Sequence, residues 1–380
     1  MKIALSAGEE SGDILGSDLM RSLKAHDDKI EFIGIGGERM KQDGLESLFP
    51  INEISKMGII EPLLSLKTIL KRRKQLISFF ESQKPDIFIG IDSPSFNLGI
   101  SKKLKKKIDI STIQYVCPQF WAWREDRIKS FSKFLDHIFC LYDFEKKILR
   151  QHNINSSFVG HPIAEKIEFE INRKEYKQKL NLDENSKYVV LMPGSRKSEV
   201  TRHFNVLASL SNHYLKLNSK LRFIFALTED SKKLNLEKEI KGNSNLEIHY
   251  GNSRNILRAC DYAVITSGTA SLEAALCKIP MIVIYKTNFL SYMILSRLIK
   301  TEFISLPNIL KKKKIVEELI QTKVTKKNLV SELEALMNKD HHDLLNDYKK
   351  IHSSLINSKK TKFYDVINSI KKIEKVFSRS

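Results

Sequence analysis

Short runs of β-branched, aromatic and other apolar residues recur along the chain, and each ends in Gly, Ser, Pro or Asp before an amphipathic helical pattern begins. This alternation predicts parallel βα units rather than hairpins. In the first half, strands are expected at residues 3–7, 31–35, 86–91, 112–116, 137–141 and 157–159. In the second half, they are expected at residues 188–192, 222–227, 246–250, 262–266 and 281–285. The pattern therefore predicts an α/β fold built from two Rossmann-like, doubly wound parallel sheets.

The strand pattern is interrupted once, and the interruption predicts where one domain ends. Residues 165–186 are charged and helical or loop-like, and the apolar runs restart at Tyr188. From about residue 312 onward the pattern is helical and rich in lysine. We therefore expect an N-terminal domain at residues 1–165, a second domain at residues 166–340, and a helical C-terminal tail at residues 341–380 that packs back across the domains.

Length and composition fit this organisation and narrow the class of protein. With 380 residues, 42% of them hydrophobic, the chain can bury two cores. The four cysteines are far apart and form no CxxC pair, so we expect no disulfide, no metal site and a reducing compartment. The apolar run at residues 1–5 is too short for a signal peptide, so we expect a cytoplasmic protein. No run reaches the roughly 18 to 20 apolar residues of a membrane-spanning helix, so any membrane contact should be peripheral.

The formal net charge of +19 is compatible with nucleic acid, an anionic membrane or an anionic substrate as partner. Lysine is spread along the whole chain, and much of it is expected on solvated helix faces. A basic nucleic-acid-binding protein is one hypothesis, but the basic motif interleaved with aromatic residues that it would carry is absent. We therefore expect no nucleic-acid partner, and charge alone does not choose between the other two.

The turns that follow the predicted strands are where ligands bind in open α/β sheets. Gly34, Gly36 and Gly37 do not complete a dinucleotide fingerprint, and residues 8–13 lack the lysine of a P-loop, which weakens the dehydrogenase and ATPase hypotheses. The turn at residues 8–13 nevertheless opens a helix whose free N–H groups suit an anionic or polyhydroxyl ligand. The plainer alternative is that Ser11 or Asp13 only caps that helix.

Two turns in the second half have the residues expected around a nucleoside diphosphate. Gly194-Ser195-Arg196 offers backbone donors and a guanidinium, and Ser267-Gly268-Thr269 opens the helix that carries Glu273. Pyrophosphate would lie on the helix N-termini with Arg196, and Glu273 would accept both ribose hydroxyls. The alternatives are a surface ion pair between Arg196 and Glu199, and a pairing of Glu273 with Arg297 or Lys278.

Three residues are candidates for a general base. Asp92 ends an apolar strand, and Pro94 is expected to delay the next helix and leave the Asp92 carboxylate exposed at the strand tip. Glu9 is the rival carboxylate, and His161 in Gly160-His161-Pro162 is the third candidate. The alternative for Asp92 is that it only caps the following helix.

Three stretches suit a lipid or sugar partner as well as a packed core. Residues 120–124 contain both tryptophans, Trp121 and Trp123, beside Arg124. Residues 57–70 are apolar and lead into the basic residues 71–74, and residues 289–299 combine aromatic and aliphatic side chains with one arginine.

With these motifs in their order and approximate spacing, the chain resembles the bacterial lipid-A-disaccharide synthases, which are GT-B glycosyltransferases. The resemblance spans nearly the whole chain. It rests on residues 8–13, Met57-Gly58, residues 92–97, Trp121-Ala122-Trp123-Arg124, residues 158–162, Pro193-Gly194-Ser195-Arg196 with Glu199, Ser267-Gly268-Thr269-Ala270 with Leu272-Glu273, and Leu306-Pro307-Asn308.

The resemblance implies two domains facing a central cleft and transfer of 2,3-diacylglucosamine from its UDP donor to the 6-hydroxyl of 2,3-diacylglucosamine 1-phosphate, with inversion. It implies no metal, no cofactor, and peripheral association with the cytoplasmic face of the inner membrane, and it allows a homodimer. The expected UDP-binding residues are Gly194, Ser195, Arg196, Ser267, Gly268, Thr269, Glu273 and Asn308. The expected acceptor or lipid contacts are Gly8, Ser11, Met57, Asn97, Trp121, Trp123 and Arg124. The catalytic candidates are Asp92, Glu9 and His161.

Two positions depart from the family pattern. The family usually has a second Asp where Ser95 stands, so Asp92 is the only acid of its turn and a paired-carboxylate mechanism is removed. Cys117-Pro118-Gln119 stands where the family has a Ser-Pro-Ser run, which affects the acceptor contacts expected near the tryptophans. The nearest rival function is another GT-B enzyme that uses UDP-N-acetylglucosamine, either a peptidoglycan transferase or an epimerase, and the epimerase would need no lipid surface.

Overall fold

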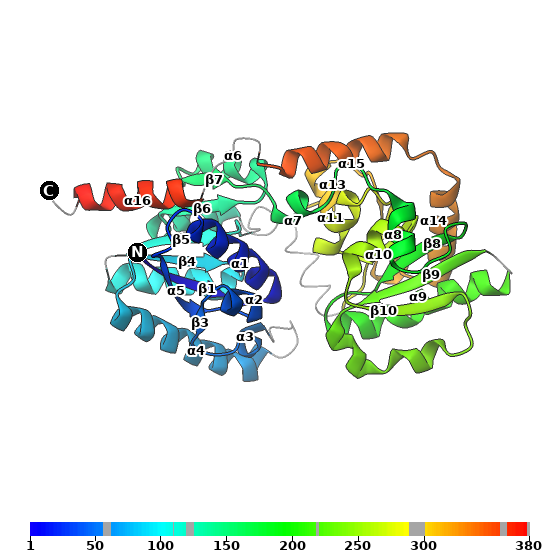
Figure 1. The fold of residues 1–380 in the computed structure, drawn as a ribbon, viewed down its shortest axis with the longest axis horizontal. Coiled ribbons are helices and arrows are strands. Elements are labelled where there is room, and N and C mark those ends of the chain that lie inside the picture. Colours follow the sequence, from blue (N-terminus) through cyan, green and yellow to red (C-terminus); the bar gives the residue numbers. More distant parts are fainter. Residues whose placement is uncertain are drawn as a thin grey trace. The chain divides into compact units, whose positions relative to one another are not determined.

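The computed structural model describes residues 1–55, 62–108, 110–118, 125–217, 220–288, 301–357 and 363–377. The chain divides into two compact units (Figure 1). Unit 1 comprises Met1–Pro162 and Leu355–Ser380, and unit 2 comprises Ile163–Ser354. The chain therefore passes from unit 1 to unit 2 after Pro162 and returns to unit 1 after Ser354.

Unit 1 contains a seven-stranded, wholly parallel sheet with the order β3-β2-β1-β4-β5-β6-β7. Its strands are β1 (Lys2–Ala7), β2 (Glu31–Ile35), β3 (Glu46–Ser47), β4 (Ile87–Ile91), β5 (Ser111–Tyr115), β6 (His137–Cys140) and β7 (Ser156–Phe158). The order reverses at β1, which lies between β2 and β4. This reversal point is where open α/β sheets bind their ligands.

The helices of unit 1 pack on both faces of its sheet, which explains why the strands read as continuous apolar runs. The helices are α1 (Glu10–Lys24), α2 (Glu38–Gln42), α3 (Asn52–Ser55), α4 (Pro62–Gln83), α5 (Pro94–Lys107), α6 (Asp143–Gln151) and α16 (Phe363–Phe377), with a 3₁₀ segment at Glu125–Lys133. Phe88 of β4 lies in one core cluster with residues of α4 and α5. Ile91 lies against Gly16 of α1, on the opposite face because side chains alternate along a strand.

Unit 2 contains a six-stranded parallel sheet with the order β10-β9-β8-β11-β12-β13. Its strands are β8 (Lys187–Met192), β9 (Leu221–Leu227), β10 (Leu246–Tyr250), β11 (Tyr262–Thr266), β12 (Met281–Tyr285) and β13 (Glu317–Ile320). The strand order again reverses beside its first strand, β8. The turns after β8 and β11 therefore belong to neighbouring strands.

The helices of unit 2 are α7 (Pro162–Lys166), α8 (Arg173–Lys179), α9 (Lys197–Lys216), α10 (Ser253–Ala259), α11 (Thr269–Leu276), α13 (Leu306–Lys311), α14 (Lys326–Asn338) and α15 (His342–Leu355), with short 3₁₀ segments at Glu229–Leu234, Leu236–Ile240 and Gln321–Lys323. Two of these helices, α9 and α14, form a core with the sheet. Phe204 of α9 stacks on Phe225 of β9 with ring centroids 4.5 Å apart. Leu329 and Leu333 of α14 complete the same cluster.

Every strand predicted from the sequence is present to within one residue at each end. Two strands were not predicted, β3 and β13. The expectation of a purely helical pattern after about residue 312 is wrong, because β13 pairs in parallel with β12. This edge strand has the sequence Glu-Glu-Leu-Ile with only Leu319 buried, so it lacks the apolar run by which the inner strands are recognised.

The C-terminal helix α16 is part of the core of unit 1. The Phe363 ring packs edge-on against Tyr115 and Phe139, with centroids 5.1 and 4.9 Å away. Ile367, one turn further along, is fully buried. Of the residues expected to form a tail, α15 lies almost wholly in unit 2 and α16 lies in unit 1.

We expect Ile367→Ala to destabilise unit 1 by about 2–5 kcal/mol, the usual cost of truncating a buried isoleucine. Urea unfolding followed by tryptophan fluorescence would measure the change. Ser369→Ala, at an exposed position of the same helix, is the control and should change the free energy of unfolding by no more than about 0.5 kcal/mol. Equal effects of the two substitutions would show that α16 does not belong to this core.

Candidate functional site

The carboxyl ends of β1 and β4 bring together two turns that lie 81 residues apart in sequence. Leu5 and Ala7 of β1 pair with Ile89 and Ile91 of β4. The Ser11 hydroxyl donates a hydrogen bond of 2.8 Å to Oδ2 of Asp92. Asp92, the expected base, and Ser11, an expected contact of the acceptor substrate, therefore touch each other where the strand order reverses.

Asp92 is held in a conformation that an aspartate adopts at some cost. Asp92 and Ser93 have φ angles of +52° and +38°, both in the left-handed region. Such residues cost on the order of 1–3 kcal/mol each and are concentrated at functional sites. The Asp92 N–H donates to the Tyr115 carbonyl at 2.8 Å, and the Asp92 carbonyl accepts from Asn97 Nδ2 at 2.9 Å and Gln114 Nε2 at 3.0 Å. These bonds fix the half-buried Asp92 at the end of β4.

The sequence suggested that Pro94 would delay the next helix. In the structure, Pro94 is instead the first residue of that helix. Helix α5 begins at Pro94, where the absent N–H is not needed and the fixed φ is helical. Ser93 is the N-cap, and no side chain caps this helix, so Asp92 is not a helix cap.

Asn97 is fully buried behind the Asp92 turn. Its Nδ2 donates to the carbonyls of Ser6, Ile91 and Asp92 at 2.9–3.1 Å, and its Oδ1 accepts from the Ser6 hydroxyl at 2.7 Å. The side chain thus joins the ends of β1 and β4. Asn97 therefore shapes the site from inside unit 1, at a position where the sequence predicted a contact with the acceptor substrate.

The turn after β1 is closely packed against the Asp92 turn. A Cβ at Gly8 would lie 2.7 Å from Ser93 Oγ, so only glycine fits there without displacement. Glu9 is the half-buried N-cap residue of α1. Asp13 does not cap α1; its carboxylate instead accepts hydrogen bonds from the N–H groups of Gly37, Arg39 and Met40 at the start of α2.

The third catalytic candidate lies further along the same edge of the sheet. His161 follows β7, is buried, and has its ring centroid 6.0 Å from that of Tyr142, which follows β6. Burial, and then the charges of Glu145 and Asp92, raise the pKa of Tyr142. Tyr142 therefore lies in the electrostatic field of Asp92 and in contact range of His161.

In unit 2, the N–H groups of the turn after β8 bind a carboxylate of the protein itself, that of Glu199. Oε2 of Glu199 accepts hydrogen bonds from the N–H groups of Ser195 and Arg196 at 3.1 and 3.3 Å. The Arg196 guanidinium lies 3.8 Å from Oε1 of Glu199, and the side chain of Arg196 is 56% exposed. Gly194, with φ +121°, has no room for a Cβ, which would lie 2.5 Å from this carboxylate. The ion pair given as the alternative role of Arg196 is therefore present, and the two backbone donors converge on one oxygen of Glu199.

The neighbouring turn, after β11, is open to solvent at its centre. Ser267 is bound within the protein, through its N–H to the Ile284 carbonyl at 2.9 Å and its hydroxyl to the Ile304 carbonyl at 2.7 Å. Gly268 and Thr269 are exposed at the N-terminus of α11, and a Cβ at Gly268 would meet no atom within 4 Å. This helix end has the space and the orientation to receive an anion.

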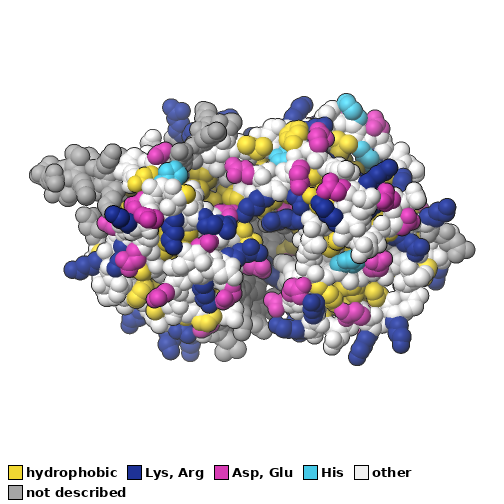
Figure 2. Space-filling model, in the orientation of Figure 1, with side chains coloured by type: hydrophobic (Ala, Val, Ile, Leu, Met, Phe, Trp, Pro, Cys, Tyr) yellow, Lys and Arg dark blue, Asp and Glu magenta, His cyan; other side chains and the backbone are white. Residues whose placement is uncertain are grey.

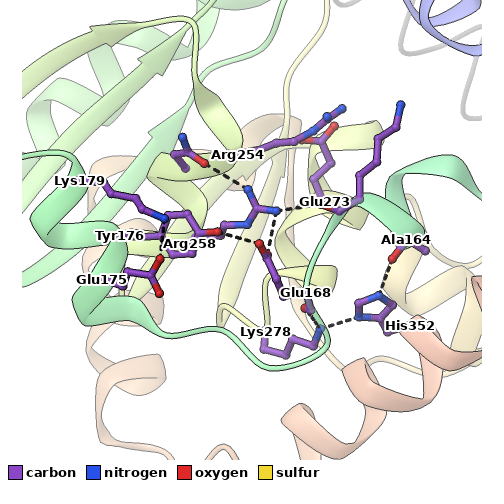
Figure 3. A network of polar contacts seen from close by, with 12 residues as sticks. Ala164, Glu168, Glu175, Tyr176, Lys179, Arg254, Arg258, Glu273, Lys278 and His352 are labelled. Atoms are coloured by element: carbon purple, nitrogen blue, oxygen red, sulfur yellow. Dashed lines mark hydrogen bonds and ion pairs between the residues drawn. The ribbon is translucent and has the colours of Figure 1, made fainter. Parts of the chain in front are cut away.

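Glu273 lies on α11, just beyond that turn, and its partner is Arg254 (Figure 3). The Arg254 Nε lies 3.5 Å from Oε2 of Glu273. The pairing with Lys278 suggested by the sequence is not observed, and Arg297 lies outside the described residues. Burial raises the pKa of Glu273, and Arg254 and Arg258 only partly oppose that effect. The carboxylate is thus poorly solvated, and its contact with ribose hydroxyls stays a prediction.

Asn308 was expected to lie beside UDP. Every donor and acceptor of its side-chain amide is hydrogen-bonded within the protein. Its Nδ2 donates to the Val316 carbonyl and to Glu318, and its Oδ1 accepts from the N–H groups of Ile315 and Val316, at 2.7–3.0 Å. An amide has two donor hydrogens and two acceptor lone pairs, so none is left for a nucleotide. The Asn308 side chain therefore positions the segment before β13, and its place beside UDP stays a prediction.

Glu318 and His203 were not predicted as site residues. Glu318 accepts from the N–H groups of Ile304 and Ser305 and from the Ser305 hydroxyl at 2.6–3.0 Å, which fixes the segment that Ser267 contacts. His203 is fully buried beneath the Gly194 turn and bonds the Pro193 carbonyl at 2.9 Å. Its spacing of seven residues from Arg196, two helical turns, is the sequence signal that could have revealed it.

Among the described residues, Cys117, Cys140 and Glu145 could hold a metal ion, since one ligand atom of each lies within 4.8 Å of the others. All three are buried. Burial, hydrogen bonding with Cys140 and the charge of Glu145 raise the pKa of the Cys117 thiol well above its usual value. Metal-binding thiols must lose their protons, and structural zinc takes four ligands. The group therefore fits packed, protonated thiols, and the absence of a resident metal stays a prediction.

Four expected acceptor residues, Met57, Trp121, Trp123 and Arg124, lie outside the described residues, as does the stretch at residues 289–299. Their part in the site stays a prediction from the family resemblance.

The sequence of nearly the whole chain matches one family of known proteins. A family model described as Lipid-A-disaccharide synthetase matches residues 3–370. The lipid-A-disaccharide synthase of Idiomarina loihiensis is 39% identical over 371 residues, covering 97% of this chain and 98% of that relative. The protein of the same name from Acinetobacter baylyi is 38% identical over 354 residues, covering 90% and 89%.

Solved structures share the fold at much lower identity. The S. aureus MnaA–UDP co-structure has a TM-score of 0.63 at 12% identity, covering 97% of this chain and 96% of that one. The crystal structure of Acinetobacter baumannii MurG has a TM-score of 0.53 at 12% identity, covering 98% and 99%. These similarities show the fold alone, the two parallel-sheet α/β domains of the GT-B architecture.

We expect Glu273→Gln to stabilise unit 2 at pH 8. Because burial raises the pKa of Glu273 above its ordinary 4.5, stability from this group is present below about pH 4.5 and is lost as the pH rises through the folded value. Removing the charge should therefore add on the order of 0.5–1 kcal/mol at pH 8, a gain common at functional sites, and less at pH 4.

Urea unfolding at both pH values measures this effect. Glu239→Gln, at an exposed position, is the control and should leave stability unchanged within about 0.5 kcal/mol. A loss of stability in Glu273→Gln at pH 8 would mean that the ion pair with Arg254 outweighs the burial of the carboxylate.

Proposed function

Because the chain belongs to the lipid-A-disaccharide synthase family, we propose that unit 2 binds the UDP part of its donor and that Asp92 of unit 1 is the base. The chain is a GT-B glycosyltransferase of lipid A biosynthesis. It transfers a 2,3-diacylglucosamine unit from its UDP donor to the 6-hydroxyl of 2,3-diacylglucosamine 1-phosphate and releases UDP. The observation that carries this function is the family match over residues 3–370.

The chemistry requires a proton acceptor beside the attacking hydroxyl. In an inverting transfer, the acceptor oxygen bonds to the anomeric carbon on the face opposite UDP, the bond to the UDP oxygen breaks, and the leaving diphosphate keeps the electron pair. The hydroxyl proton passes to a base, which typically contributes about 10²- to 10⁴-fold. Asp92 is supported by its fixed, strained position at the end of β4 and by its hydrogen bond with Ser11. Glu9 and His161 are the alternatives.

In unit 2, we assign the diphosphate to the turns after β8 and β11. This assignment is supported by the two N–H groups that donate to the Glu199 carboxylate at the first turn and by the exposed Arg196 beside it. A phosphate using these donors would displace Glu199. The open N-terminus of α11, at Gly268 and Thr269, supplies further donors and its dipole. Glu273 would accept the ribose hydroxyls.

Acceptor binding is assigned to the turn at Gly8 and Ser11, with Asn97 positioning it from behind. The resemblance adds Met57, Trp121, Trp123 and Arg124 as contacts for the sugar and acyl chains. The departure at Ser95 leaves Asp92 as the only carboxylate of its turn, which fits its assignment as the base.

The rival GT-B functions are not favoured. The MnaA and MurG structures resemble this chain at 12% identity, which does not separate one GT-B activity from another. The relatives that are about 39% identical over nearly the full chain are named lipid-A-disaccharide synthases. Figure 2 shows Lys and Arg interspersed with Asp and Glu over the described residues of the visible face of each unit.

We propose that one face of α4 contacts an anionic membrane surface. Lys67, Lys71 and Lys74 are exposed on this helix at spacings of three and four residues, and Leu70 between them is 50% exposed. The neighbouring arginines are engaged within unit 1. Arg72 pairs with Glu53 at 2.6 Å and Arg73 donates to the Ser95 carbonyl. Within the described part of the chain, no helix is long and apolar enough to cross a bilayer.

We expect Asp92→Asn to lower turnover by at least about a hundredfold, because the amide cannot accept the hydroxyl proton. UDP affinity, measured by calorimetry, should stay within about twofold of the original. Arg196→Ala is the matched comparison and should weaken UDP binding by about tenfold or more, since a charge-assisted hydrogen bond is lost. Turnover is assayed with defined diacyl donor and acceptor. Near-normal turnover in Asp92→Asn would mean that Glu9 or His161 is the base.

A triple change of Lys67, Lys71 and Lys74 to Gln should weaken binding to phosphatidylglycerol vesicles by about a hundredfold, since each basic residue near anionic lipid contributes about 1 kcal/mol. Vesicle co-sedimentation at low salt measures it. The same change at Lys102, Lys103 and Lys106, exposed on α5, removes equal charge and should have a much smaller effect. Equal losses in the two triples would mean that total charge, not this face of α4, governs binding.

A further inference from the structure

His203 lies inside unit 2, directly beneath the turns assigned to the diphosphate. It belongs to α9, two helical turns after Arg196, and its side chain is fully buried. The imidazole therefore cannot meet a ligand directly, and any effect it has on binding passes through the backbone that it contacts.

Each nitrogen of the imidazole has a defined part. The Lys286 N–H lies 3.0 Å from Nε2, and because a backbone amide can only donate, Nε2 must be the unprotonated acceptor. Nδ1 consequently carries the proton and donates to the Pro193 carbonyl at 2.9 Å. The Thr266 hydroxyl lies 3.4 Å from the same Nδ1. The geometry thus requires a neutral histidine in one tautomer.

These contacts join the ends of three neighbouring strands. Pro193 follows β8 and precedes Gly194, Thr266 ends β11 and precedes Ser267, and Lys286 follows β12. One side chain therefore bonds the segments after β8 and β12 and lies against the end of β11 between them, directly below the two turns that would hold the diphosphate.

The surroundings keep His203 neutral. Burial lowers its pKa, while the Pro193 and Glu199 carbonyls and the Glu199 charge raise it to a lesser extent and Arg202 lowers it further. Glu199 and Arg202 belong to α9 itself. From β12, Tyr285 adds a phenol whose own pKa is raised by burial, and the Lys286 side chain is exposed.

We propose that His203 is a positioning residue of the nucleotide site, whose neutral imidazole holds the turns after β8 and β11 in register for the diphosphate. The inference rests on the proposed UDP site. Protonation would convert Nε2 into a donor facing the Lys286 N–H, so the contact would be lost. Donor affinity should then fall as the pH drops below neutrality, toward the lowered pKa of His203.

The test measures binding of UDP-N-acetylglucosamine by calorimetry from pH 8 to pH 5, because its diphosphate is a diester without a proton to gain in this range. His203→Leu should weaken binding at pH 8 by about tenfold, since the Pro193 carbonyl and Lys286 N–H lose their partner. His203→Gln places an amide oxygen near the position of Nε2 and should restore much of the affinity. Thermal unfolding of each variant shows whether it is folded.

The pH profile separates positioning from general stability. Affinity of the original protein should fall more steeply toward pH 5 than that of His203→Gln, which has no imidazole to protonate. Titration of Glu273 contributes to both profiles alike, so their difference reports His203. This comparison remains decisive even if His203→Leu does not fold.

The outcomes distinguish this inference from the function on which it rests. If Arg196→Ala weakens binding but His203→Gln has the original affinity and an unchanged pH profile, His203 is not a positioning residue. If neither Arg196→Ala nor the His203 variants alter binding, the UDP site itself is misassigned and the inference falls with it.

Discussion

A parallel sheet leaves the peptide groups at its carboxyl edge without ladder partners, and in each unit buried polar side chains satisfy several of them. In unit 1, Asn97 bonds the carbonyls of Ser6, Ile91 and Asp92. In unit 2, His203 bonds Pro193 and Lys286. An unsatisfied buried peptide group costs about 1–3 kcal/mol, so these side chains stabilise the turns and at the same time fix where their exposed residues lie. The chemistry at each edge is therefore built on groups that do not touch substrate.

The inner strands could be predicted because each is an apolar run covered on both faces, so their limits agree with the structure to within one residue. The edge strands β7 and β10 were predicted as well, but β3, which has two residues, and β13, with the sequence Glu-Glu-Leu-Ile, were missed because neither contains an apolar run. The turns were located correctly for the same reason as the strands. Hydrogen-bond partners were harder to predict. Asp13 caps α2, which starts 25 residues later, and only the packing of α1 against α2 makes that contact.

For the site residues as well, positions in the fold were easier to predict from the sequence than hydrogen-bond partners. Arg196 and Glu199 are close in sequence, and their pairing was foreseen as the alternative to phosphate binding by Arg196. That Glu199 also takes two backbone donors depends on the angle at which α9 starts, which sequence does not reveal. Glu273 pairs with Arg254 because β11 lies beside β8 and the preceding helix α10 packs near α11. The Asn308 amide is saturated by Ile315, Val316 and Glu318, which lie just before or within the unrecognised strand β13. Family resemblance supplied the reaction, and the structure distinguishes exposed groups from supporting ones.

The double crossing of the chain has a consequence for how the protein is made. Unit 2 is contiguous, but unit 1 is completed by α16, whose Phe363 and Ile367 fill the core beside Tyr115 and Phe139. On the ribosome, residues 1–162 emerge first yet must wait for synthesis of all of unit 2 before this helix is available. The first part of the chain to be synthesised is thus the last to complete its fold, and during that interval the apolar surface awaiting α16 is exposed to other molecules.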